Sequence, residues 1–245
     1  MGPAGVNSTI AHPEVPTGRP LDSAVAPAWH TAIVLFALLG LSSIGAHVDL
    51  RSIFGMHGRL LSYLFVMAFE WTTVAFIGWG LKRRGLRLFD VVGGRWARAG
   101  DVFRDLGIGI AFILIIGGAV QGLGSLFKIA PPQGMLEMLP QTWIEIIAWI
   151  PVSMTGGFCE EVIFRGYLQR QFSSFTHSLT GGIVFQALAF GLAHGYQGWK
   201  LMSLIAIYGA GFGLLAHWRH SLRPGMIGHA LQDTAGGLLA RLLTH

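Results

Sequence analysis

Ionisable residues are rare in the apolar stretches of this sequence, and the strongest candidates for chemistry lie in the segment Cys159–Arg165. If this segment is helical, Glu161 and Arg165 are four residues apart and form an ion pair on one face. Glu160 then points about 100° away from that face, beside Gly156 and Gly157, which leave open space next to its carboxylate. We expect the pair to be structural and Glu160 to act as a general base.

Two further segments place a histidine four residues from a neighbour on the same helix face. In Phe190-Gly-Leu-Ala-His194 the neighbour is a phenyl ring, and in His229-Ala-Leu-Gln-Asp233 it is a carboxylate. His229 and Asp233 can meet directly or face a common cavity. A single histidine on an apolar helix is more often a packed residue than a catalyst. Each segment taken alone therefore leaves a catalytic and a structural role open.

A helical hairpin brings the first two segments to a similar depth in the membrane. The helix from Glu160 to a turn near residues 172–178 is about 18 Å long, and the helix from that turn back to His194 is about 24 Å long. His229 and Asp233 lie in the first turns of the last helix and must reach this depth from the same side. This arrangement predicts a funnel that opens to the cytoplasm.

The composition places these helices in a lipid bilayer. Of the 245 residues, 52% are hydrophobic and only 12% are charged, whereas soluble domains carry about 25% charged residues. The 35 glycines suit helices that pack closely in a membrane. Apolar stretches of about 20 residues cross the hydrocarbon core, which predicts an all-α bundle of about seven (six to eight) transmembrane helices. The predicted spans are residues 29–46, 60–81, 105–127, 142–163, 179–197, 201–218 and 225–243.

The chain divides into a flexible N-terminal tail, residues 1–26, and one membrane domain, residues 27–245. The tail lacks the basic start and apolar core of a signal peptide. Seven of the 17 basic residues gather around the connection between the second and third predicted spans, as in cytoplasmic loops. We therefore expect a multi-pass protein of the cytoplasmic (plasma) membrane whose N-terminus and active-site opening face the cytoplasm. This concentration also argues against nucleic acid as the reason for the net charge of +5; the residues are Lys82, Arg83, Arg84, Arg87, Arg95, Arg98 and Arg104.

The three segments in this order, Glu-Glu-x-x-x-Arg, Phe-x-x-x-His and His-x-x-x-Asn/Asp on consecutive membrane helices, resemble the CAAX-protease and bacteriocin-processing (CPBP, or Abi) family of intramembrane proteases. That family includes the Ras-converting CAAX endopeptidases. The resemblance covers residues 140–240, which it identifies as the catalytic core. It implies a hydrolase that acts on peptide bonds, with membrane lipid and a peptide or membrane-protein substrate as partners.

The resemblance also implies a role for each residue of the three motifs. Glu160 activates the attacking water, His194 holds or polarises it, and Glu161 with Arg165 fixes the position of Glu160. His229 and Asp233 stabilise the tetrahedral oxyanion. An ionised Asp233 would repel that oxyanion, so this residue must be protonated or serve to orient His229.

Three other interpretations use the same buried residues. Glu160, His194, His229 and Asp233 are all zinc-ligand types, but the sequence has no His-Glu-x-x-His motif, and we expect no cofactor. Intramembrane Glu and His also build the proton relays of transporters. A non-catalytic immunity or binding protein of the same fold would retain the helices without the hydrolysis.

The remaining buried candidates are expected to be structural. Glu70 should hydrogen-bond Thr72, Thr73 or a neighbouring helix, and Glu145 should lie at the membrane interface near Trp143. Cys159 should be an inert packing residue, and as the only cysteine it excludes an intrachain disulfide.

Overall fold

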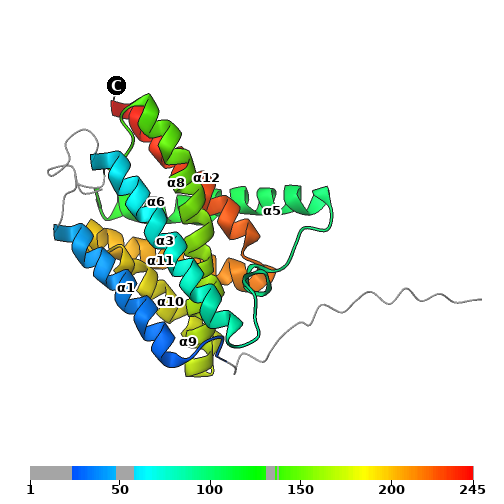
Figure 1. The fold of residues 1–245 in the computed structure, drawn as a ribbon. Coiled ribbons are helices and arrows are strands. Elements are labelled where there is room, and N and C mark those ends of the chain that lie inside the picture. The colour runs from blue at the N-terminus through cyan, green and yellow to red at the C-terminus, as the bar shows by residue number, and fades with distance from the viewer. Residues whose placement is uncertain (1–23, 48–57, 131–135, 137, 245) are drawn as a thin grey trace, which may run out of the picture.

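A bundle of helices forms the part of the chain that the structure describes, a computed structural model covering residues 24–47, 58–130, 136 and 138–244. The predicted all-α class is confirmed, because the described residues contain helices and turns and no strand. Most of the predicted tail, residues 1–23, lies outside the described part. Figure 1 shows α1, α3, α8 and α12 as inclined helices and α5, α6 and α11 as helices that cross them.

A helix lies at each of the seven predicted spans. The first five are α1 (Ala28–His47), α3 (Gly58–Lys82), α5 and α6 (Ala99–Phe112 and Gly118–Leu126), α8 (Trp143–Glu160) and α10 (Leu179–Ala193). The last two are α11 (Trp199–Arg219) and α12 (Arg223–Thr244), and a short helix, α4 (Leu88–Val92), lies in the basic loop.

Within the part of the chain that the structure describes, four helical stretches are long and apolar enough to cross a membrane. They are Gly58–Lys82, Ala99–Leu126, Trp143–Thr176 and Trp199–Arg219, and the shorter apolar helices cover Ala28–Ile44 and Leu179–Ala193. The protein is therefore an integral membrane protein built from helices, as its composition predicts.

The fourth predicted span differs from the structure in length. The prediction ends it at residue 163, but α8 continues through a π-helical segment, η3 (Glu161–Leu168), into α9 (Gln169–Thr176). The long helix ends at His177, whose backbone is left-handed, and α10 follows at once. The predicted hairpin turn near residues 172–178 is thus confirmed at its C-terminal end.

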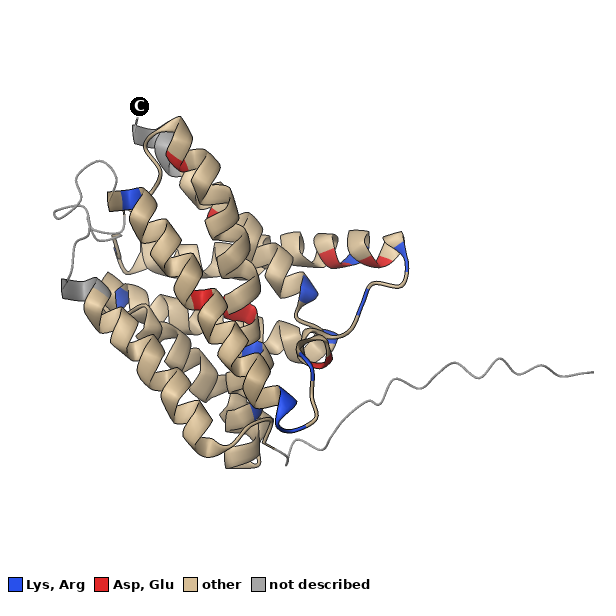
Figure 2. Cartoon of the chain, in the orientation of Figure 1, with Lys and Arg blue, Asp and Glu red and all other residues tan. Residues whose placement is uncertain are grey.

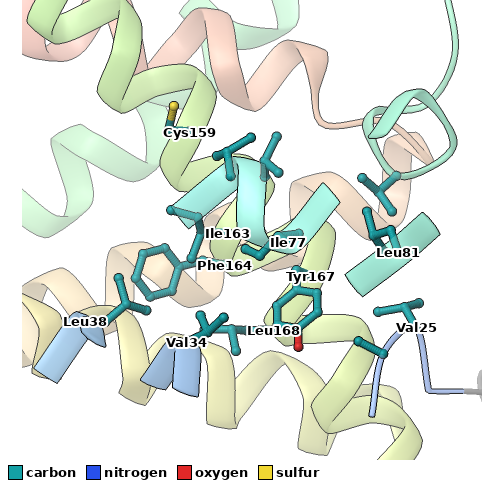
Figure 3. Close-up of a cluster of buried hydrophobic side chains, with 14 of the residues drawn as sticks. Val25, Val34, Leu38, Ile77, Leu81, Cys159, Ile163, Phe164, Tyr167 and Leu168 are labelled. Carbon is teal, nitrogen blue, oxygen red and sulfur yellow. The ribbon is translucent and has the colours of Figure 1, made fainter. Parts of the chain in front are cut away.

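The segment η3 lies at the centre of the hydrophobic core. Its apolar residues are at most 2% exposed and pack against Val34 and Leu38 of α1 and Ile77 and Leu81 of α3 (Figure 3). Ordered packing on all sides of η3 fixes the orientation of the charged residues that it carries. The buried residues of η3 in this cluster are Val162, Ile163, Phe164, Tyr167 and Leu168.

Glycine allows α8 and α12 to cross in close contact. A Cβ atom at Gly157 would lie 2.6 Å from the backbone nitrogen of Ala230 and 2.8 Å from the carbonyl oxygen of Met226. Both neighbours are backbone atoms of α12, so a side chain at this position would separate the two helices. Close approach of backbones at small residues is a common way to pack helices in membranes.

Gly157→Ala should therefore destabilise the protein by about 1–3 kcal/mol, the usual cost of overpacking a dense core. It should also lower activity, because it displaces α12. The thermal unfolding midpoint in detergent measures the first effect. Gly118→Ala is the matched control, since no atom lies within 4 Å of a Cβ atom there. Equal midpoints for the two variants would show that the α8–α12 crossing does not need glycine.

Candidate active site

Glu161 and Arg165 form a fully buried ion pair. The Nη1 atom of Arg165 lies 2.9 Å from Oε1 of Glu161, and both side chains are 0% exposed. Nη2 of Arg165 donates to the carbonyl oxygen of Gly209 in α11 at 3.2 Å. The guanidinium also lies over the rings of Phe190 and Phe212, at 4.3 and 4.9 Å from their centroids. The pair thus joins η3 to α10 and α11.

Glu160 lies at the end of α8, with its side chain 19% exposed. Its Oε2 atom is buried and has no hydrogen-bond partner among the described residues. The Nε2 atom of His229 lies 3.7 Å from this oxygen. A carboxylate oxygen without a hydrogen-bond partner is available to accept a proton or to hold a water molecule.

The open space that the sequence predicts beside Glu160 is filled by α12. A Cβ atom at Gly156 would lie 3.6 Å from Oδ2 of Asp233, and Gly157 contacts the backbone of α12. The prediction of an empty space was therefore wrong. The two glycines admit α12, and α12 brings Asp233 next to Glu160.

His229 is buried among three carboxylates. Its Nδ1 atom lies 3.3 Å from Oε1 of Glu161, and its Nε2 atom lies 3.7 Å from Glu160 and 3.6 Å from Oδ2 of Asp233. His229 and Asp233 thus meet directly and also face the same site, so both arrangements left open by the sequence occur together. Because both ring nitrogens face oxygen acceptors, the ring is held in one orientation.

His194 lies just beyond the end of α10, where it is the C-terminal cap residue. Its Nδ1 atom is 2.8 Å from the carbonyl oxygen of Phe190. A carbonyl oxygen can only accept, so Nδ1 carries the hydrogen and Nε2 of a neutral ring carries a lone pair. The ring packs on Phe190 with 4.8 Å between centroids, and His194 interacts electrostatically with Asp233.

The six predicted residues therefore converge from three parts of the chain. Side-chain contacts of at most 3.7 Å join five of them, Glu160, Glu161, Arg165, His229 and Asp233. His194 joins the group at longer range, through Phe190 and through its interaction with Asp233.

Glu70 of α3 also lies near this group, where the sequence interpretation did not expect it. It is 8% exposed, its Oε2 atom has no hydrogen-bond partner among the described residues, and it interacts electrostatically with Glu160, His229 and Asp233. In Figure 2 acidic positions on α3 and α8 lie side by side in the middle of the bundle. An acid in the middle of an apolar span was the signal that could have identified it.

The predicted hydrogen bonds of Glu70 with threonine were wrong. Thr72 and Thr73 donate instead to the carbonyl oxygens of Ala68 and Phe69, at 2.7 and 2.9 Å. The residue after Glu70, Trp71, makes the contacts between α3 and α8 at this level. There the indole of Trp71 donates to Thr155 at 3.4 Å and stacks on Phe158 at 5.4 Å.

Glu145 and Cys159, the other two buried candidates, make contacts of a structural kind. Glu145 pairs with Arg59 at 2.8 Å and accepts from the backbone nitrogens of Gln141 and Thr142, so it caps the start of α8. Cys159 is 0% exposed and belongs to the hydrophobic core.

The start of α12 is anchored by a second charged cluster. Asp105 of α5 accepts from the indole of Trp96 at 2.9 Å and lies 3.6 Å from Arg219 and 3.5 Å from Arg223. These contacts tie the middle of α5 and the last residue of α11 to the first residue of α12. They fix the helix that carries His229 and Asp233 six to ten residues further along.

The residues do not fit a metal site in this arrangement. Within the described residues, no group of three or more His, Cys, Asp or Glu side chains is placed to hold a metal ion. The Nε2 atom of His229 lies 3.7 Å from Oε2 of Glu160 and 3.6 Å from Oδ2 of Asp233.

Comparison with protein families matches residues 141–235 to the family described as Type II CAAX prenyl endopeptidase Rce1-like. The match begins just before α8, ends within α12 and contains all three motifs, although it covers less than half of the chain. No curated protein and no solved structure matches the chain. The family resemblance predicted from the motifs is confirmed for this part of the sequence.

Proposed function

We propose, from the match of residues 141–235 to the Rce1-like family of CAAX endopeptidases, that the protein is an intramembrane endopeptidase. Its substrate would be a peptide or a membrane-associated protein, and a water molecule activated by Glu160 would cleave the peptide bond. The observation that carries this proposal is the position of Glu160, whose Oε2 atom lacks a hydrogen bond among the described residues and lies 3.7 Å from His229.

In the first step, each hydrogen of the attacking water is accepted by a different side chain. Glu160 accepts one hydrogen at Oε2, and the lone pair on Nε2 of His194 accepts the other. The water oxygen forms a bond to the carbonyl carbon, Glu160 takes the proton, and the π electrons move to the carbonyl oxygen. When the C–N bond breaks, Glu160 returns this proton to the leaving amine.

His229 and Asp233 are proposed to act as a unit on the charged intermediate. Asp233 lies 3.6 Å from Nε2 of His229, which favours the role of orienting His229 over direct contact with the oxyanion. Glu161 holds Nδ1 of the same ring at 3.3 Å. The imidazole is thus preorganised for the negative charge that develops during attack.

The orientation in the membrane follows from the basic residues. In Figure 2 blue positions gather around the loop between α3 and α5 and at the neighbouring start of α12. Lysine and arginine mark the cytoplasmic side, so we place this end, the N-terminus and the opening of the site toward the cytoplasm of the plasma membrane. The proposal leaves the substrate as a membrane-associated peptide and does not require it to be prenylated.

The test compares peptide termini in membranes that contain the parent protein or Glu160→Gln at equal abundance. The amide keeps the shape of the side chain and removes the base. New termini that mass spectrometry detects only with the parent would establish a peptidase and give the cleavage sequence. Identical termini, with both proteins inserted and folded, would favour an immunity or binding protein, and a Glu160→Gln variant that still protects or binds would support that alternative.

A further inference from the structure

Hydrolysis of a peptide bond places negative charge on the carbonyl oxygen, which needs hydrogen-bond donors nearby. The predicted site residues supply few of them. His194 uses its Nδ1 hydrogen on the carbonyl oxygen of Phe190, and a carboxylate at Asp233 has no hydrogen to donate. Arg165 is 0% exposed and cannot reach a substrate. Of the six predicted site residues, His229 remains as a donor to this oxygen, and its ring already faces three carboxylates.

Tyr196 lies next to this group and belongs to none of the three motifs. It occupies the single 3₁₀ turn η4 (Gly195–Gln197) that directly follows His194 and packs against α1 and α11. Its ring lies 6.2 Å from the ring of His194, with 29° between the planes. The phenol interacts electrostatically with Glu160, Asp233 and Glu70, which come from three different helices. Tyr196 therefore lies beside the predicted site residues, next to His194.

The hydroxyl of Tyr196 is held by a hydrogen bond that it accepts, and its own hydrogen is available to donate. The side-chain amide of Gln197 donates to the phenolic oxygen at 2.9 Å. A hydroxyl that accepts in this way still carries its own hydrogen, and among the described residues this hydrogen has no acceptor. Burial raises the pKa of Tyr196 to about 12. The hydroxyl therefore stays protonated, and able to donate, at every pH at which the protein would work.

We propose that Tyr196 is a further catalytic residue, whose hydroxyl donates a hydrogen bond to the carbonyl oxygen of the scissile peptide as that oxygen becomes negatively charged. The inference rests on the proposed peptidase function. No proton leaves Tyr196 in this step, because the proton of the attacking water goes to Glu160. Tyr196 supplies the neutral donor that Asp233 cannot provide as a carboxylate.

The experiment measures kcat and KM for the parent, Glu160→Gln, Tyr196→Phe and Tyr63→Phe in liposomes. The substrate is a quenched fluorescent peptide that contains the bond identified from the new termini. Tyr63→Phe is the matched control, since it also loses one phenolic hydroxyl, which in Tyr63 donates to the carbonyl oxygen of Met138. Thermal unfolding midpoints show whether each variant is folded.

Tyr196→Phe should lower kcat on the order of 100-fold, as expected for one lost oxyanion donor, with little change in KM or in the midpoint. Tyr63→Phe should keep the parental kcat. With 3-fluorotyrosine at position 196, a more acidic phenol, the loss of activity at alkaline pH should begin at lower pH. A parental kcat in Tyr196→Phe beside an inactive Glu160→Gln would overturn the role of Tyr196 and leave the peptidase intact. Equal rates for the parent and Glu160→Gln would overturn both.

Discussion

Glu160→Gln is expected to lower kcat by about 10²–10⁴-fold, the usual contribution of a general base, and to leave the protein folded. The side chain is partly exposed, and its Oε2 atom makes no hydrogen bond within the described residues. Replacing the carboxylate with an amide of the same shape therefore removes the proton acceptor and few structural contacts. Steady-state cleavage of a peptide by purified protein in liposomes measures the effect.

Glu161→Gln is the variant to compare with Glu160→Gln, because it makes the same chemical change at the next residue. This variant breaks a fully buried ion pair and a contact with His229, so it should lose thermal stability as well as activity. If Glu160→Gln unfolded as readily as Glu161→Gln, the assignment of one carboxylate to chemistry and the other to structure would be wrong.

Arg165→Met is expected to destabilise the protein by about 3–5 kcal/mol, because it leaves the charge of Glu161 buried without its partner. The guanidinium also contacts Gly209, Phe190 and Phe212, so its loss loosens η3 from α10 and α11. The free energy of unfolding in detergent, measured by denaturant titration, tests this expectation.

A double variant separates the charge effect from the loss of packing. Replacing both members of a buried ion pair with apolar residues is often close to neutral, so Glu161→Met with Arg165→Met should recover much of the stability that Arg165→Met alone loses. A double variant as unstable as the single one would show that the contacts of Arg165 with α10 and α11, and not its charge, stabilise the fold.

The sequence predicted the helices better than their ends. Long apolar stretches mark the spans because only a helix satisfies the backbone in lipid. The length of α8 through α9 escaped prediction because Glu161 and Arg165 in the middle interrupt the apolar pattern. They are tolerated there because they pair with each other in the core. The π-helical geometry of η3 has no sequence signal at the level of periodicity.

The candidate site could also be predicted only in part: its contacts within one helix follow from spacing, and its contacts between helices do not. The spacing of Glu161 and Arg165 predicts a local contact within one helix, and the structure contains it. The position of Asp233 against Gly156 and the position of Glu70 against Glu160 depend on how separate helices pack. Such contacts join residues far apart in the chain, so spacing alone could not give them. Tyr196 was missed because the fifth span was predicted to continue to residue 197, whereas α10 ends at Ala193 and the turn η4 follows it.

The most direct test of the central claim measures peptide cleavage and proton flux in the same liposomes, with the parent protein and with Glu160→Gln. A hydrolytic site and a proton relay would both depend on Glu160, but only the first breaks a peptide bond. We expect cleavage that requires Glu160 and no proton flux above that of empty liposomes. Proton flux that requires Glu160, without cleavage of any peptide found in the membranes, would contradict the proposal and identify these buried carboxylates as a transport path.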